Sequence, residues 1–264
     1  MTPTEPCKLI AVIGGGVIGG GWVARCLLNG ITVNLYDPDP NAPSKIDEIM
    51  INAKLAFDKL IEGPVPPQGK LYFADSIASA VATADLILEA VPERLDIKQS
   101  VYRDIEFNAA ADTLIASSTS GILPSDLQDK MVTPDRLVVA HPFNPVYLLP
   151  LVEIVGGAKT SRETIKSAAH LFRQLGMHPL HVRTEIPAFI ADRFLEAVWR
   201  EALWLVKDGV ATTAEIDDAI RYGFGLRWAQ MGLFETYRVA GGEAGMAHFI
   251  AQFGPCLKWP WTKL

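Results

Sequence analysis

The chain has 264 residues, of which 49% are hydrophobic and 20% are charged, and its net charge is −6 at pH 7. This is the balance of a globular protein, with room for one large domain or two smaller ones. A mildly acidic surface gives no reason to expect nucleic acid or an anionic membrane as a partner. Cys7, Cys26 and Cys256 are too few and too widely spaced for a disulfide framework or a metal site, so we expect no metal and a reducing, cytoplasmic location.

We expect neither a signal peptide nor a membrane-spanning helix in this sequence. Residues 1–8 contain prolines and a glutamate and lack the apolar core of a signal peptide. The most apolar long stretch, residues 186–206, is interrupted by five charged side chains, which a membrane-spanning helix would not tolerate.

Strand and helix patterns alternate along the first two thirds of the chain. The expected strands are residues 8–13, 31–36, 85–91, 113–117, 136–140 and 151–155. The expected helices are residues 17–28, 44–61 and 94–110, the first of them ending at the helix-terminating pair Asn29-Gly30. A Pro/Gly-rich loop is expected at residues 63–69. The alternation predicts an α/β fold, a Rossmann-type doubly wound sheet that is mostly parallel and has helices on both faces.

Beyond about residue 186 the pattern changes. Residues 188–207, 213–222 and 245–253 have helical spacing of apolar residues, and no convincing strand lies between them. We therefore expect two domains: a Rossmann-type domain at residues 1–186 and a smaller all-helical domain at residues 187–264.

A glycine-rich loop follows the first expected strand and opens the first helix. Gly14, Gly16 and Gly19 form G-x-G-x-x-G, in which the glycines permit a tight turn, a close approach of pyrophosphate and close helix–strand packing. Asp37 ends the next strand, where an acid accepts hydrogen bonds from ribose hydroxyls and repels a 2′-phosphate. The pattern predicts NAD as cofactor. Its expected contacts are Gly14, Gly16, Val17, Ile18, Gly19 and Asp37.

A histidine and a glutamate occupy two neighbouring strands near the end of this domain. His141 follows one buried strand, and Glu153 lies in the next, twelve residues later. Oxidation of an alcohol needs a base for the hydroxyl proton, and histidine titrates near neutral pH. A carboxylate on its far ring nitrogen would fix the tautomer and stabilise the imidazolium. Spacing alone also allows an ordinary structural histidine here.

Several spaced motifs together resemble the 3-hydroxyacyl-CoA dehydrogenase family. They are SSTSG at residues 117–121, HPFNP at residues 141–145 and LVE at residues 151–153, and the similarity runs from Lys8 to at least Thr236. The resemblance implies that His141 is the catalytic base, that Glu153 orients it, and that Ser120 and Asn144 bind the substrate oxygen. It also implies that Glu93 and Lys98 contact NAD near the nicotinamide, and that the C-terminal helical domain contributes to substrate binding and forms a homodimer.

Two departures from the family pattern concern the substrate. The region between Asp37 and Ala74 is short, and acids offset its lysines, whereas members that use CoA have a longer, basic helical arm there. This favours a small free substrate. The second departure is Asp192, which replaces the asparagine usual before the arginine that is here Arg193.

Asp192 belongs to an unusual helix face. At about 100° per residue, Phe189, Asp192, Glu196 and Trp199 fall within roughly 80°. Acids and aromatic rings together suit a cation that donates no hydrogen bonds, so this face suggests a 3-hydroxy acid bearing a quaternary ammonium group. Arg227 is the candidate for its carboxylate. In the alternative interpretation, the aromatic residues are core and the acids pair with Arg193 and Arg200.

Three other functions stay open. A neutral polyol acid such as gulonate would not call for Asp192, and an acyl-CoA is disfavoured by the short arm. A non-enzymatic NAD-binding protein would not require Ser120, His141, Asn144 and Glu153 at their spacing. The chain ends at Leu264, earlier than the family pattern, so we expect a shortened second domain.

Overall fold

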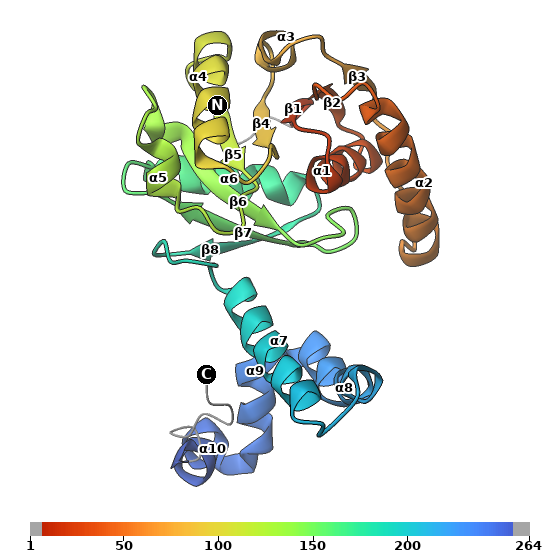
Figure 1. The fold of residues 1–264 in the computed structure, drawn as a ribbon, viewed down its shortest axis with the longest axis vertical. Helices are drawn as coiled ribbons and strands as arrows, with labels where there is room; N and C mark the ends of the chain where they lie inside the picture. Colours follow the sequence, from red (N-terminus) through yellow and green to blue (C-terminus); the bar gives the residue numbers. More distant parts are fainter. Residues whose placement is uncertain (1–6, 256–264) are drawn as a thin grey trace. The chain divides into compact units, whose positions relative to one another are not determined.

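The structure, a computed structural model, describes residues 7–255. It divides into two compact units, one up to Ile190 and the other from Ala191. The first unit contains one eight-stranded sheet in the order β3-β2-β1-β4-β5-β6-β7-β8 (Figure 1). The strands are β1 (Leu9–Ile13), β2 (Thr32–Tyr36), β3 (Leu71–Phe73), β4 (Leu86–Glu89), β5 (Leu114–Ser117), β6 (Leu137–Pro142), β7 (Leu151–Gly156) and β8 (His178–Val182). The predicted doubly wound, mostly parallel sheet is confirmed.

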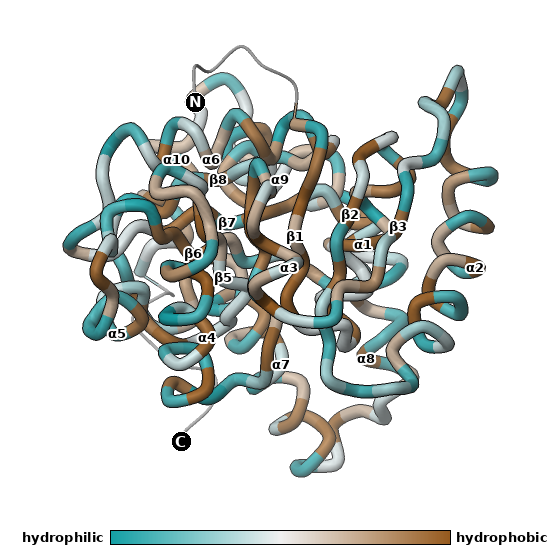
Figure 2. The backbone as a smooth tube through the Cα atoms, turned by 90° about the horizontal axis from the view of Figure 1, so that it is seen from above, coloured by the Kyte–Doolittle hydropathy of each residue, from teal (hydrophilic) through white to brown (hydrophobic). Residues whose placement is uncertain are grey.

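Helices cover both faces of this sheet, and each face has its own hydrophobic core. The helices of the first unit are α1 (Val17–Leu28), α2 (Ala42–Leu60), α3 (Ile77–Val81), α4 (Leu95–Asn108), α5 (Pro124–Gln128) and α6 (Arg162–Gln174). Side chains of α1, α2 and α6 pack on one face, and those of α3, α4 and α5 on the other. Strands β4, β5 and β6 are buried along their whole length, and the colouring of Figure 2 shows β1 as a largely hydrophobic strand. Burial on both faces explains why the strands are continuous apolar runs.

Helix α1 begins and ends where the glycines predict. Gly16 precedes its first turn, and Gly30 follows its last with φ of 79°, a conformation that glycine adopts at little cost. The amide of Ile31 returns to the carbonyl of Cys26 at 3.0 Å, which closes the helix end and directs the chain into β2.

One pair of neighbouring strands is antiparallel, and it is the pair that carries the histidine and the glutamate. Strands β6 and β7 are joined by residues 143–150, a connection too short for the crossover that parallel strands need. The chain therefore turns back, and His141 lies directly opposite Glu153 in the register. His141 is inside β6 and not after it, because β6 extends two residues further than predicted.

Several elements of the first unit were not predicted. Strand β3 has three residues, and β8 carries two histidines and a proline in the sequence HPLHV, so neither has a clear strand pattern. Helices α3 and α5 have five residues each, too few for a helical period. Helix α6 is also absent from the predicted elements, although its 13 residues have the apolar spacing of an amphipathic helix.

The second unit consists of helices: α7 (Ala191–Lys207), α8 (Thr213–Ala219), α9 (Gly225–Ala240) and α10 (Gly245–Phe253). The all-helical prediction is confirmed, although α9 was missed and the predicted start of α7 at residue 188 was wrong. Ala188 and Phe189 have φ of 61° and 47°, outside the right-handed helical region, so the helix starts only at Ala191. No helix within residues 7–255 is long and apolar enough to cross a membrane. Cys256 and the segment that ends at Leu264 lie outside the described residues.

Candidate active site

The glycine loop after β1 is shaped by steric limits at two of its three glycines. Gly14 has φ of 98°, and a Cβ there would lie 2.6 Å from the carbonyl oxygen of Ala90. A Cβ on Gly19 would lie 1.8 Å from the carbonyl oxygen of Gly14. Gly16 differs, because a Cβ there would meet no atom within 4 Å. The space beside Gly16 is therefore open, as the approach of a pyrophosphate requires.

The first turn of α1 offers backbone N–H groups to that space. Its N-cap is Gly16, which has no side chain to accept a hydrogen bond from the turn. Unpaired N–H groups and the positive end of the helix dipole favour an anion. The exposed Val17 and the half-buried Ile18 lie in this turn, as the sequence predicts.

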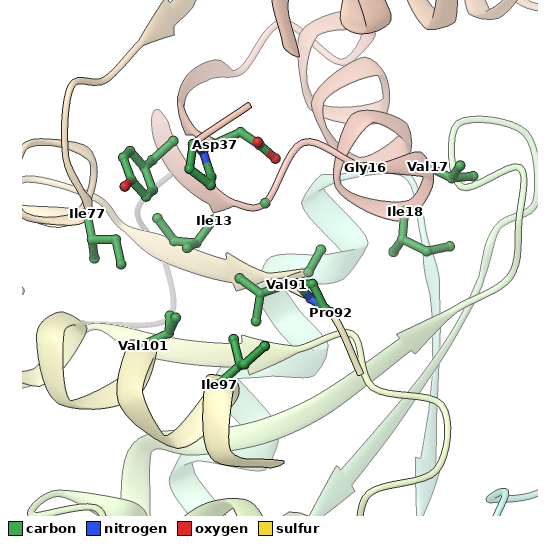
Figure 3. Close-up of a pocket in the computed structure, with 14 residues that line it drawn as sticks. Ile13, Gly16, Val17, Ile18, Asp37, Ile77, Val91, Pro92, Ile97 and Val101 are labelled. Carbon is green, nitrogen blue, oxygen red and sulfur yellow. The ribbon is translucent and has the colours of Figure 1, made fainter. Parts of the chain in front are cut away.

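A cavity of about 670 Å³ opens next to the loop and is mostly apolar (Figure 3). Figure 3 shows side chains of Ile13, Val91, Ile97 and Val101 directed into a common space, with Asp37 at its rim. The Asp37 carboxylate is already oriented, because it accepts hydrogen bonds from the amides of Gly15 at 2.5 Å and Asp39 at 2.7 Å. An apolar slot beside a fixed acid and a helix N-terminus fits an adenine, a ribose and a pyrophosphate, so these residues fit NAD.

A buried ion pair lies beneath the loops that follow β4 and β5. Lys98, which is 1% exposed, contacts Glu89 at 2.8 Å, and Glu89 is fully buried. Glu89 also accepts hydrogen bonds from Tyr102 at 2.6 Å, Ser117 at 2.7 Å and the amide of Val91 at 2.8 Å. Burial, reinforced by the neighbouring Glu89, raises the pKa of Tyr102, which keeps that phenol a hydrogen-bond donor. Lys98 and Tyr102 lie one turn apart on α4, facing the end of β4.

Glu93 connects this ion pair to the SSTSG loop. Its carboxylate lies 3.3 Å from the ammonium of Lys98 and accepts a hydrogen bond from the hydroxyl of Thr119 and one from the amide of Ser120. Partial burial acts to raise the pKa of Glu93, but the Thr119 hydrogen bond and the charge of Lys98 outweigh it, and the pKa is lowered. The Ser120 loop is thus held by a carboxylate that stays ionised.

The histidine and the glutamate predicted to act together are in contact. His141 Nδ1 lies 3.0 Å from Glu153 Oε2, and their side chains are 7% and 0% exposed. Both point to the face of the sheet that α3, α4 and α5 cover, because they share the alternation of Val139 and Val155. A buried carboxylate on Nδ1 favours the tautomer that leaves Nε2 as the acceptor.

Aromatic rings enclose the imidazole. Phe143 packs edge-on to His141 with ring centres 5.2 Å apart, and Phe189 packs at 5.6 Å with an interplanar angle of 52°. The second oxygen of Glu153, Oε1, accepts a hydrogen bond from the amide of Ile190 at 2.9 Å. Phe189 is fully buried and precedes α7, so the prediction that it lies on this helix was wrong.

Two side chains of α1 that were not predicted as functional hold the loops that follow β5 and β6. Trp22 donates from its indole to the hydroxyl of Ser118 at 2.9 Å. The buried Arg25 donates to the carbonyls of Val146 and Leu149, both at 3.0 Å, and so fixes the loop between β6 and β7. A charged residue in the middle of an otherwise apolar helix was the one available signal for Arg25.

All but one of the remaining predicted residues lie in exposed positions. Ser120 and Asn144 are exposed, in the loops that follow β5 and β6. In the second unit, Glu196 and the 59%-exposed Trp199 lie on α7 with the half-buried Asp192, and Arg227 lies on α9.

The fold and the nucleotide loop define a dinucleotide-binding protein of the Rossmann type. Residues 9–186 match the NAD-binding domain of 3-hydroxyacyl-CoA dehydrogenase, and residues 189–260 match its C-terminal domain. The chain belongs to the 3-hydroxyacyl-CoA dehydrogenase family and is an NAD-dependent oxidoreductase that acts on a CH–OH group.

Several individual proteins have high sequence identity to this chain. An L-carnitine dehydrogenase of Mesorhizobium japonicum is 62% identical over 96% of this chain and 70% of its own length. An L-carnitine dehydrogenase/betainyl-CoA thioesterase of Ruegeria pomeroyi is 63% identical over 96% of this chain, which spans only 52% of that protein. Among solved structures, 5-formyl-3-hydroxy-2-methylpyridine 4-carboxylic acid 5-dehydrogenase aligns with a TM-score of 0.87 at 33% identity, covering 98% of this chain and 83% of that one.

Proposed function

We propose that the chain oxidises the 3-hydroxyl of L-carnitine to 3-dehydrocarnitine with NAD as acceptor. The observation that carries the chemistry is the buried contact of His141 with Glu153 at 3.0 Å. The identity of the substrate is supported by relatives of 62% and 63% identity that are named L-carnitine dehydrogenases.

His141 is the proposed general base. With Nδ1 directed at Glu153, Nε2 accepts the hydroxyl proton, and the buried carboxylate stabilises the imidazolium that forms. Bound NAD would supply the hydride acceptor for the carbon that bears this hydroxyl. Ser120 and Asn144 are the proposed hydrogen-bond partners of the substrate oxygen, and both expose their side chains in loops at the carboxyl ends of β5 and β6.

The cation of carnitine is the proposed reason for the acids of α7. A trimethylammonium group donates no hydrogen bonds, so charge and aromatic surface must select it. Asp192, Glu196 and Trp199 share one face of α7 and are the proposed contacts, and Arg227 is the proposed partner of the carboxylate. Glu93 and Lys98 are proposed to support the nicotinamide end of NAD.

The test is NADH formation at 340 nm with L-carnitine, L-gulonate and 3-hydroxybutyryl-CoA as alternative substrates. We expect L-carnitine to give the highest kcat/KM by at least about tenfold, which corresponds to about 1.4 kcal/mol of transition-state binding. A higher kcat/KM for gulonate or for the CoA ester would replace the proposal with that activity.

The role of His141 is tested separately. His141→Gln should lower kcat by at least ~10²-fold and leave NAD binding unchanged, because only the proton acceptor is removed. His178→Gln, at an exposed position of β8, is the matched control and should keep wild-type kcat. Near-normal turnover by His141→Gln would remove His141 from the mechanism.

We also propose a homodimer formed through the helical unit, in the cytoplasm. No residue of α7 is buried, and Phe194, Leu195 and Leu203 are each more than half exposed. A large exposed apolar surface on a helix is typical of a subunit interface. Sedimentation analysis tests the dimer: the wild type should sediment as a dimer, and Leu203→Glu, which places a charge in this surface, should weaken it. A monomeric wild type would be the contrary result.

The proposed cytoplasmic location is supported by Cys7 and Cys26, which are buried free thiols.

A further inference from the structure

The turn at residues 186–190 is held in an unfavourable backbone conformation beside the His–Glu pair. Ala188 and Phe189 are consecutive, and they are the non-glycine residues with positive φ within residues 7–255. Left-handed conformations are disfavoured for residues with a Cβ, and they persist where surrounding contacts fix them. The contacts made by this turn show what fixes it here.

Each of the last two residues of the turn touches one member of the pair. The ring of Phe189 packs on the imidazole of His141, with its side chain fully buried. The amide of the next residue, Ile190, donates to Glu153 Oε1 at 2.9 Å, while Oε2 of the same carboxylate faces His141. Both oxygens of Glu153 are therefore engaged, and the carboxylate cannot rotate without losing a contact.

We propose that the 186–190 turn is a positioning element for the catalytic base, with Phe189 as its principal side chain. The inference rests on the proposed role of His141. Phe189 covers one side of the imidazole and excludes water from it, while the Ile190 amide fixes the plane of the carboxylate that selects the Nδ1-protonated tautomer. The left-handed backbone is what allows one turn to present a ring and an N–H group to two neighbouring strands.

The buried position of Phe189 requires a control for simple loss of packing. Phe172 is also a fully buried phenylalanine, but it packs against Trp22 on the opposite face of the sheet. Phe189→Leu and Phe172→Leu remove the same atoms from comparable surroundings. Phe189→Met, whose flexible side chain fills an irregular space, is the second variant if Phe189→Leu does not fold.

Two measurements test the proposal. The first is the tautomer of His141 by NMR of protein labelled with ¹⁵N-histidine, with NAD bound and no substrate, using His141→Gln to assign the signal. The second is kcat and KM for L-carnitine. We expect Phe189→Leu to mix the two tautomers and to lower kcat on the order of 10- to 100-fold with little change in KM, because a small misplacement of a catalytic group is costly. Phe172→Leu should lower the melting temperature and leave the tautomer and kcat unchanged.

Failure of this proposal can be told apart from failure of the proposed function. If the wild type does not oxidise carnitine, the proposed function falls, while the tautomer of the Phe189 variants still decides the positioning role. If the wild type does oxidise carnitine, two results would overturn the positioning role. The first is that both Phe189 variants keep a single tautomer and wild-type kcat. The second is that they lose no more kcat than Phe172→Leu does.

Discussion

Replacing Lys98 by methionine distinguishes a structural role from a cofactor contact. The resemblance to the family implies that Lys98 contacts NAD, but its ammonium lies in a buried pair with Glu89 at 2.8 Å. Lys98→Met keeps much of the aliphatic stem and leaves the Glu89 carboxylate buried without its counter-ion. The protein without NAD should therefore lose stability, which a pure cofactor contact would not cause.

The size of the loss follows from the partners that Glu89 keeps. Breaking a buried ion pair by removing one partner costs about 3–5 kcal/mol. Tyr102, Ser117 and the amide of Val91 still donate to Glu89, so we expect a value near the lower limit, about 3 kcal/mol. For a chain of this size each kcal/mol shifts Tm by roughly 2–4 °C, which predicts a fall of roughly 6–12 °C.

Thermal unfolding without NAD, followed by fluorescence or calorimetry, is the assay. The matched control is Lys45→Met, which removes a surface pair with Asp39 at 2.6 Å whose side chains are 59% and 34% exposed, and which should leave Tm nearly unchanged. The double variant Glu89→Gln/Lys98→Met should recover part of the loss, since no uncompensated charge remains. An unchanged Tm for Lys98→Met, together with weaker NAD binding, would refute the structural role.

Three further predictions concern the cofactor, the substrate and pH. Asp37→Ala should lower the ratio of kcat/KM for NAD to kcat/KM for NADP by about 10- to 150-fold, because a charge-assisted hydrogen bond of ~1.5–3 kcal/mol is lost. Equal use of both cofactors by the wild type would contradict this role of Asp37. Asp192→Asn should raise KM for carnitine about 30- to 1000-fold (~2–4 kcal/mol) and change KM for an uncharged 3-hydroxy acid much less, whereas equal effects would make Asp192 a helix-supporting residue. The pKa of the Glu93 carboxyl is lowered in the folded state, so ionised Glu93 stabilises the fold fully above the ordinary pKa of 4.5, and this stabilisation is lost as pH falls through the lower folded pKa. Glu93→Gln should therefore flatten the acid side of a plot of Tm against pH. An unaltered slope would count against the lowered pKa.

The sequence predicts best what local pattern encodes. The glycine loop, the end of α1 at Asn29-Gly30 and the apolar strands depend on residues close together in the chain, and all of them are found. The contact of His141 with Glu153 was also within reach, because a twelve-residue spacing across a short connection brings the two strands side by side.

The parts that were missed depend on distant contacts or on backbone strain. Arg25 finds its acceptors more than 120 positions away, and Trp22 finds Ser118 across 96 positions, which no local period reveals. Phe189 was assigned to a helix because its spacing fits one, but positive φ at two residues breaks the period. Lys98 matched a family motif, whereas its burial beside Glu89 depends on the packing of α4 against β4 and β5.

The three glycines of the nucleotide loop serve two different purposes: two are needed for the loop to fold, and one is needed for it to bind NAD. At Gly14 and Gly19 a methyl group would collide with the protein's own backbone, so glycine is required there for folding, whether or not the cofactor is bound. The loop then meets its ligand preorganised, and association does not have to supply the entropy of ordering it. Gly16 is the opposite case, since alanine there fits the empty protein and obstructs only an incoming phosphate. A survey of tolerated substitutions should separate these positions, with Gly14 and Gly19 limiting the yield of folded protein and Gly16 limiting only its affinity for NAD.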